Sequence, residues 1–335
     1  MGDIRALGYL RIDTTDLDRW RTLAHDVLDL GVGAGGDDDT LHLRLDERAR
    51  RITLRRAEKD NLDAVGWEVR DEIALDRVRA TLTEHGIAYR DLTHDEAQAI
   101  KVDGAITLED PCGQRLEIFH GAELDHSTVS TKYRTEFVTD ELGLGHLVVP
   151  TTDYDATIGF YRDVLGFHTR GAFPFPSAPG MPPLRIQFMG VNPRHHSFAV
   201  MPAPHMGPGI VHIMLEVAEM DMVAQAMERT TEHGFGISST LGRHTNDKMV
   251  SYYLRAPGGW DIEYGYDGLM VDENQYLPQN ITADSYWGHD WSGSEPLACT
   301  LPLEEPAPEA AAESLSEPLV DTAAAPSGQP AASPA

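Results

Sequence analysis

The sequence predicts an α+β fold of two tandem modules, residues 1–135 and 136–292, each built from two β-α-β-β-β repeats. The main observation is that stretches of the first half recur, in the same order, in the second half. The recurring pairs are residues 7–31 and 144–171, 67–87 and 215–235, and 109–121 and 255–265. The second observation is that the order strand, helix, strands occurs twice within each half.

The first pair of segments opens each module. Its sequences are LGYLRIDTTDLDRWRTLAHDVLDLG and LGHLVVPTTDYDATIGFYRDVLGFHTRG. Each begins as a strand pattern and reaches Thr-Thr-Asp, a cluster that suits the N-cap of a helix. An amphipathic helix pattern follows and ends at Asp-Val-Leu with a glycine nearby. The spacing from Asp16 to Asp26 equals that from Asp153 to Asp163, which indicates a duplicated unit.

The other two pairs complete each module. The sequences WEVRDEIALDRVRATLTEHGI and LEVAEMDMVAQAMERTTEHGF read as a strand followed by a helix. The sequences EDPCGQRLEIFHG and RAPGGWDIEYG read as a turn followed by a strand. Because whole modules are duplicated, positions shared by the twins are those that the fold itself needs.

Composition limits the classes of function. The 335 residues are 41% hydrophobic and 24% charged, which is usual for globular proteins. The net charge of -27 disfavours nucleic acid and anionic membranes, which bind basic surfaces. No run approaches a membrane span, and two cysteines argue against a disulfide framework. We therefore expect a cytoplasmic protein with no nucleic-acid or membrane partner, and a disordered, acidic, Ala/Pro-rich tail at residues 293–335.

Three residues of the second module form a candidate metal site. His146, His212 and Glu263 lie on three predicted strands, and strand alternation lets all three side chains point into one cavity. A lone buried carboxylate is costly unless it is paired or binds a metal. Two imidazoles and one carboxylate with open positions suit Fe(II) in oxygen chemistry. Taken singly, each residue could instead be a hydrogen-bonded core residue.

The twin module allows an internal comparison. The matched positions are His146 and Tyr9, His212 and Ala64, and Glu263 and Glu117. Since the first module lacks both histidines, the fold does not require them. We therefore expect the second module alone to hold a metal, and Glu117 to be a structural acid.

Six short motifs link the chain to a known family. They are GLGH (143–146), NPRHHSFAV (192–200), HIMLEV (212–217), LGRHTND (241–247), SYYLRAPGGWDIEYG (251–265) and YWGHDW (286–291). Through them the chain resembles the type I extradiol catechol dioxygenases of the vicinal oxygen chelate superfamily, especially the 2,3-dihydroxybiphenyl 1,2-dioxygenase branch. The resemblance runs from residue 5 to about residue 292. It implies that each module forms a curved, half-open barrel and that only the C-terminal module is catalytic.

The resemblance also implies roles for individual residues. His146, His212 and Glu263 match the ligands of Fe(II), with Mn(II) as an alternative metal. His196 matches the acid/base histidine. It is favoured over the alternative, His195, on the assumption that neighbours on a strand face opposite ways, so that only one of the two serves the site. The residues expected to hydrogen-bond the catechol oxygens are His244 and Tyr253, and those expected to line the substrate are Val148, Phe188, Asn246 and Asp247.

The function implied is ring-cleaving extradiol (meta) dioxygenation of a catechol such as 2,3-dihydroxybiphenyl or a 3-substituted catechol, in aromatic compound degradation. The partners would be a small aromatic diol and O2, and the enzyme would be a homo-oligomer. Residues 171–185, with several prolines and aromatics, are expected to form part of the pocket rim. The alternatives are a 4-hydroxyphenylpyruvate dioxygenase-like enzyme, a glyoxalase-type isomerase, and a non-catalytic module that binds an aromatic ligand.

Overall fold

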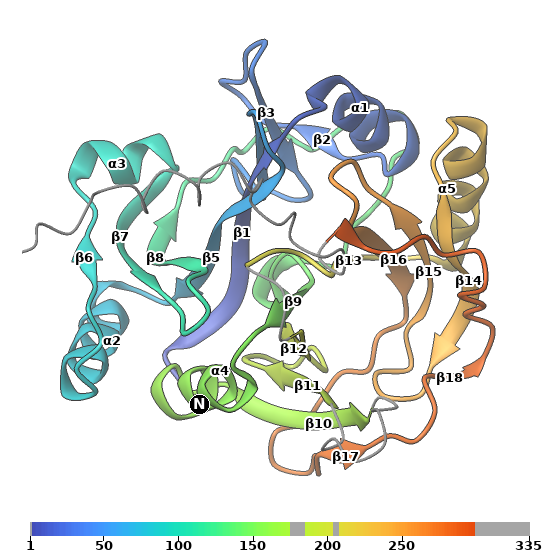
Figure 1. Cartoon of the computed structure of the whole chain (residues 1–335). Helices are drawn as coiled ribbons and strands as arrows, with labels where there is room; N and C mark the ends of the chain where they lie inside the picture. Colours follow the sequence, from blue (N-terminus) through green and yellow to red (C-terminus); the bar gives the residue numbers. More distant parts are fainter. Residues whose placement is uncertain (1, 175–184, 204–207, 299–335) are drawn as a thin grey trace, which may run out of the picture. The chain divides into compact units, whose positions relative to one another are not determined.

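Two β-sheets with few helices make up the described part of the chain (Figure 1). The structure is a computed structural model that describes residues 2–174, 185–203 and 208–298. The predicted tail therefore lies almost wholly outside the described residues. Within them, no helix has the length and apolar character needed to cross a membrane.

The first sheet has the strand order β2-β3-β4-β1-β5-β8-β7-β6, so β2 and β6 form its two free edges. Its strands are β1 (Ile4–Thr14), β2 (Gly31–Val32), β3 (Thr40–Arg44), β4 (Ile52–Arg56), β5 (Asn61–Val69), β6 (Arg90–Asp91), β7 (Val102–Glu109) and β8 (Arg115–Ala122). Its helical segments are α1 (Leu17–Thr22), the π-turn η1 (Leu23–Val27), α2 (Glu72–Glu84) and α3 (His94–Ala99).

The second sheet has the order β17-β10-β11-β12-β9-β13-β16-β15-β14-β18. Its strands are β9 (His146–Thr151), β10 (His168–Pro174), β11 (Arg185–Gly190), β12 (Phe198–Pro202), β13 (His212–Val217), β14 (Ile237–His244), β15 (Val250–Arg255), β16 (Asp261–Tyr266), β17 (Gln279–Asn280) and β18 (Ser285–Trp287). Its helical segments are the 3₁₀ turn η2 (Asp140–Leu142), α4 (Tyr154–Gly159), the π-turn η3 (Phe160–Val164) and α5 (Met220–Glu232).

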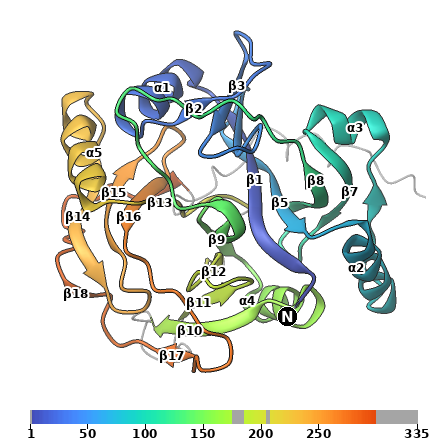
Figure 2. The same cartoon turned by 180° about the vertical axis from the view of Figure 1, so that it is seen from behind.

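The four β-α-β-β-β repeats predicted from the sequence are confirmed. They begin at β1, β5, β9 and β13, and α3 is an insertion into the second of them. The predicted caps are present: the side chain of Asp16 accepts from the backbone N–H of Arg19, and Asp153 accepts from that of Ala156. Helix α2 packs on β5 and β8, and α5 packs on β13, β15 and β16 (Figure 2). The exact module boundaries stay a prediction.

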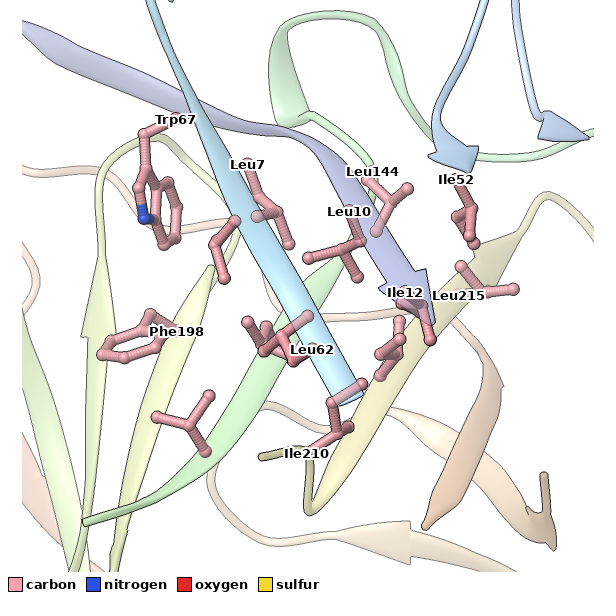
Figure 3. Packing of buried hydrophobic residues seen from close by; sticks show 14 of the residues in the cluster. Leu7, Leu10, Ile12, Ile52, Leu62, Trp67, Leu144, Phe198, Ile210 and Leu215 are labelled. Carbon is pink, nitrogen blue, oxygen red and sulfur yellow. The ribbon is translucent and has the colours of Figure 1, made fainter. Parts of the chain in front are cut away.

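One hydrophobic core joins the two sheets (Figure 3). Figure 3 shows Leu10 of β1 close to Leu144, just before β9. The indole of Trp67 on β5 meets the ring of Phe167 at 4.8 Å and that of Phe198 at 5.8 Å, both edge-on. Because these contacts cross from one sheet to the other, the sheets belong to one compact unit.

Candidate active site

The predicted metal ligands converge from three neighbouring strands. His146 on β9 pairs with Met214 on β13, and Met214 pairs with Glu263 on β16. His212 lies two residues before Met214, so strand alternation turns its side chain to the same face. The Nε2 atoms of His146 and His212 are 3.0 Å apart. Oε2 of Glu263 lies 3.2 Å from the first of these nitrogens and 3.5 Å from the second.

These donor atoms fit a single metal ion. Ligands about 2.0–2.1 Å from an ion and at right angles to one another would themselves be about 3 Å apart. The observed spacing of 3.0–3.5 Å agrees with three ligands on one face of an octahedron. Two imidazoles and a carboxylate in this arrangement suit Fe(II) with open positions for other ligands.

The protonation states of the ligands also fit a cation. Burial lowers the pKa of His146 to about 4, so its imidazole is neutral near pH 7. Burial alone would raise the pKa of Glu263, but hydrogen bonds from the three histidines around it hold that pKa well below its usual range. A neutral imidazole and an ionised carboxylate are the forms that bind metal.

The second carboxylate oxygen of Glu263 is held by other groups. The hydroxyl of Ser251 donates to Oε1 at 2.7 Å, and His244 Nε2 lies 3.4 Å from the same oxygen. His289 Nε2 lies 3.0 Å from the carbonyl oxygen of Ser251, and its ring centroid is 4.0 Å from that of His244. Because Oε1 is occupied in this way, Oε2 is the oxygen presented to the two ligand histidines.

His244 and Tyr253 form a hydrogen-bonded pair beside the ligands, with 2.8 Å between Nε2 and the hydroxyl oxygen. His244 Nδ1 lies 3.4 Å from Oδ1 of Asp284. Burial alone would lower the pKa of His244, but the carboxylates of Asp284 and Glu263 outweigh burial and raise that pKa well above its usual range. The pair can therefore donate hydrogen bonds to an anionic oxygen.

A cavity of about 390 Å³ opens above the ligands, and all ten residues predicted for the site line it. They are His146, Val148, Phe188, His196, His212, His244, Asn246, Asp247, Tyr253 and Glu263. The described residues that sequence reasoning did not assign to this cavity are Phe173, Ile186, Met201, Val211, Ile281, Asp284 and Trp291. Phe173 does lie in the segment expected to form the rim, whose residues 175–184 are outside the described part.

Two signals could have pointed to the missed residues. Trp291 ends the YWGHDW motif, and its ring centroid lies 4.7 Å from that of Tyr253. Asp284 stands just before that motif. Ile281 has no comparable signal, because it follows a strand of only two residues.

The assumption used to choose between His195 and His196 was wrong. Strand β12 begins only at Phe198, so the two histidines do not alternate on a strand. Their Nδ1 atoms are 3.0 Å apart, which places them in one hydrogen-bonded pair. His196 does line the cavity, whereas the Nε2 atom of His195 meets the hydroxyl of Tyr276 at 2.8 Å.

The N-terminal module repeats the same frame without the histidines. Tyr9 and Glu117 both pair with Gly66, just as His146 and Glu263 both pair with Met214. This is the alignment predicted from the repeat.

A protein cation lies beside the glutamate of that module. The hydroxyl of Tyr9 donates to Glu117 at 2.6 Å, and Arg11 donates to the other oxygen of that carboxylate, also at 2.6 Å. Arg11 bonds Asp63 as well. Glu117 is thus a structural acid, as expected.

Comparison with known proteins shows the family of the chain. Residues 143–264 match the Glyoxalase/Bleomycin resistance protein/Dioxygenase superfamily, and residues 7–56 match the family described as Dihydroxybiphenyl dioxygenase BphC D1. The first match lies in the C-terminal module, which contains the candidate metal site, and the second lies in the N-terminal module.

Individual relatives cover nearly the whole chain. The iron-dependent extradiol dioxygenase of Rhodococcus jostii (strain RHA1) is 44% identical over 88% of this chain and 99% of its own length. The biphenyl-2,3-diol 1,2-dioxygenase of Paraburkholderia xenovorans (strain LB400) is 37% identical over 85% and 95%. A crystal structure of catechol 2,3-dioxygenase superposes with a TM-score of 0.82 at 30% identity, over 90% of this chain and 98% of that one. The chain therefore belongs to the extradiol dioxygenase family.

Proposed function

We propose that this protein is an Fe(II)-dependent dioxygenase that opens the ring of a 3-substituted catechol next to its two hydroxyl groups. The observation that carries the proposal is the buried set of His146, His212 and Glu263, whose donor atoms lie 3.0–3.5 Å apart at the floor of a cavity. A bound ferrous ion would supply positive charge that acidifies a phenol and open positions for the diol and O2. The curated relatives that the chain matches are named for reactions of this kind.

The protein groups have separate tasks in this proposal. Tyr253 and His244 hold the catechol oxygens by hydrogen bonds. His196 also lines the cavity, with its ring stacked on that of His146 at 4.0 Å between centroids, and takes a proton from the second hydroxyl.

The cavity wall indicates the type of ring substituent. It is apolar on the side formed by Val148, Phe188, Met201, Val211 and Ile281. A volume of about 390 Å³ is at the lower end of the range of roughly 300–1,000 Å³ for small-molecule sites. We therefore propose an aryl or alkyl group at the 3-position, as in 2,3-dihydroxybiphenyl or 3-methylcatechol. The cytoplasmic location and the homo-oligomeric state expected from the sequence remain predictions.

The direct test is anaerobic loading with Fe(II), followed by an aerobic assay on catechol, 3-methylcatechol, 2,3-dihydroxybiphenyl and a 4-substituted catechol. We expect one Fe(II) per chain, a yellow ring-opened product, O2 uptake that matches it, and the highest kcat/KM for a 3-substituted diol. Iron that binds without O2 uptake on any diol would contradict the dioxygenase proposal. Failure to bind iron would contradict the metal site itself.

The role of His196 has its own test. His196→Phe keeps an aromatic ring over His146 but removes the proton acceptor. We expect kcat to fall by about 100-fold, within the usual range for an acid/base residue, while the Kd for the anaerobic diol changes little. Weak diol binding with normal turnover would exclude the acid/base role.

A further inference from the structure

We infer that His195 and Tyr276 are positioning residues that fix the tautomer of His196, so that its Nε2 carries the free lone pair in the cavity. The use of that lone pair as a base rests on the proposed function. The tautomer itself follows from a chain of three hydrogen bonds that can run in one direction only.

The direction of these hydrogen bonds is set at the end farthest from His196, where Tyr276 donates to a backbone carbonyl. The hydroxyl of Tyr276 lies 2.7 Å from the backbone carbonyl oxygen of Arg170, which can only accept. The single hydroxyl proton of Tyr276 is therefore used there. Toward His195 Nε2, at 2.8 Å, the tyrosine oxygen can only accept, so that nitrogen must carry a proton.

The same reasoning gives the proton positions on His195 and His196. Burial lowers the pKa of His195 to about 4, so its ring is neutral near pH 7 and holds one proton. With that proton on Nε2, Nδ1 of His195 is a bare acceptor. It lies 3.0 Å from Nδ1 of His196, which must therefore be the donor. In the neutral ring of His196, Nε2 is then left unprotonated.

The groups that form the chain are held rigidly. Arg170 is 2% exposed, and its Nε donates to the carbonyl oxygen of His195 at 2.9 Å. Its other nitrogens bind the carboxylate of Glu273, three residues before Tyr276. The buried guanidinium of Arg170 thus links the turn that holds His195 to the segment that holds Tyr276. The backbone carbonyl of the same arginine accepts the outermost hydrogen bond of the series.

No other described group competes effectively for either nitrogen of His196. The nearest carboxylate oxygen, Oδ2 of Asp247, lies 3.7 Å from Nδ1, which is beyond hydrogen-bond distance. The ring is packed between His146, at 4.0 Å, and Phe188, at 5.0 Å between centroids. Among the residues that the structure describes, Nε2 has no hydrogen-bond partner.

The test reads the tautomer directly. We would record ¹⁵N NMR spectra of the histidine side chains in protein loaded with diamagnetic Zn(II), for the parent chain, Tyr276→Phe and His195→Leu. His195→Asn retains an acceptor close to the position of Nδ1 and serves as the conservative variant. Tyr154→Phe, a half-buried tyrosine on α4 away from the cavity, is the matched control.

We expect His196 to be protonated at Nδ1 in the parent, His195→Asn and Tyr154→Phe. In Tyr276→Phe and His195→Leu, the Nε2-protonated form should grow. With Fe(II) loaded, those two variants should lose about tenfold in kcat with KM for the diol within twofold, since a wrongly placed proton removes part of the acid/base contribution. An unchanged Nδ1–H signal in both variants would overturn the inference. A changed tautomer with unchanged kcat would leave the inference standing and contradict the role of His196 as the base.

Discussion

A buried glutamate occupies equivalent positions in the two modules and has two different partners. Glu117 accepts hydrogen bonds from Arg11 and Tyr9, whereas Glu263 lies among three histidines and Ser251. Oε2 of Glu263 lies within 3.5 Å of the Nε2 atoms of two histidines, where a metal ion would fit. The pair is therefore a built-in comparison between a structural acid and a proposed metal ligand.

The first residue-scale prediction uses this pair. Glu263→Gln should weaken Fe(II) binding by more than about 100-fold, because loss of a ligand costs more than loss of an outer-shell partner. Its matched control, Glu117→Gln, should keep one iron per chain and lose about 1–3 kcal/mol of unfolding free energy, since Arg11 loses a charged acceptor. Atomic absorption measures the iron content of each variant, and urea unfolding measures its unfolding free energy. Equal iron loss in both variants would contradict the distinction.

The second residue-scale prediction concerns pH. Burial, and then the charge of Arg50, lowers the pKa of His42 to about 4. Below about pH 6.5 the unfolded chain takes up a proton that the folded chain refuses until about pH 4, so His42 removes stability as the pH falls through this range. His42 pairs with Thr53 as Phe188 pairs with Ala199, so the twin suggests His42→Phe. The difference in unfolding free energy between variant and parent should grow from pH 7 to pH 4.5; a constant difference would refute the prediction.

The helices and strands follow closely from local signals. Asp16 and Asp153 cap helices where Thr-Thr-Asp predicted them, and each of the four repeats begins at an expected strand. The convergence of His146, His212 and Glu263 was also predictable, since strand alternation and the twin module both constrain these positions. Sequence reasoning failed where the backbone leaves regular structure. His195 and His196 precede β12, and the 281–291 segment has no counterpart in the first module.

The contribution of part of this segment to substrate binding can be tested at the scale of an element. Residues 285–291, which we call the closing segment, contain β18, His289 and Trp291. Gly288 has φ of 72°, and a Cβ there would overlap the backbone at Leu241 and Gly242. Gly288→Ala should therefore shift the closing segment away from β14 and raise KM for the diol about tenfold, which corresponds to about 1.4 kcal/mol.

The control for this prediction is Gly293→Ala, because a Cβ at that position meets no described atom within 4 Å. Steady-state kinetics gives KM, and hydrogen exchange of β18 reports whether the segment has loosened. A normal KM in Gly288→Ala, together with faster exchange, would separate the closing segment from substrate binding.

At the scale of the whole molecule, we expect the shared core to make the two sheets unfold together. Trp67 is fully buried and contacts Phe167 and Phe198 across the boundary between them. Trp67→Ala should cost about 3–5 kcal/mol and leave a single calorimetric transition at lower temperature. Trp287→Ala, 49% exposed, should change stability by less than about 0.5 kcal/mol. Two separate transitions in Trp67→Ala would show that the sheets are independent.

The arginine in the first module also bears on how the protein responds to iron shortage. Arg11 is covalently part of the chain, so neither a chelator nor iron starvation can remove the positive charge that it places beside Glu117 and Asp63. The first module therefore keeps the ion pairs of Arg11 whatever the supply of metal. Joined to the other half by a common core, it should preserve the scaffold while the iron is absent. We expect inactive, iron-depleted protein to be a reserve that regains turnover on simple addition of Fe(II) and reductant, with no need for refolding.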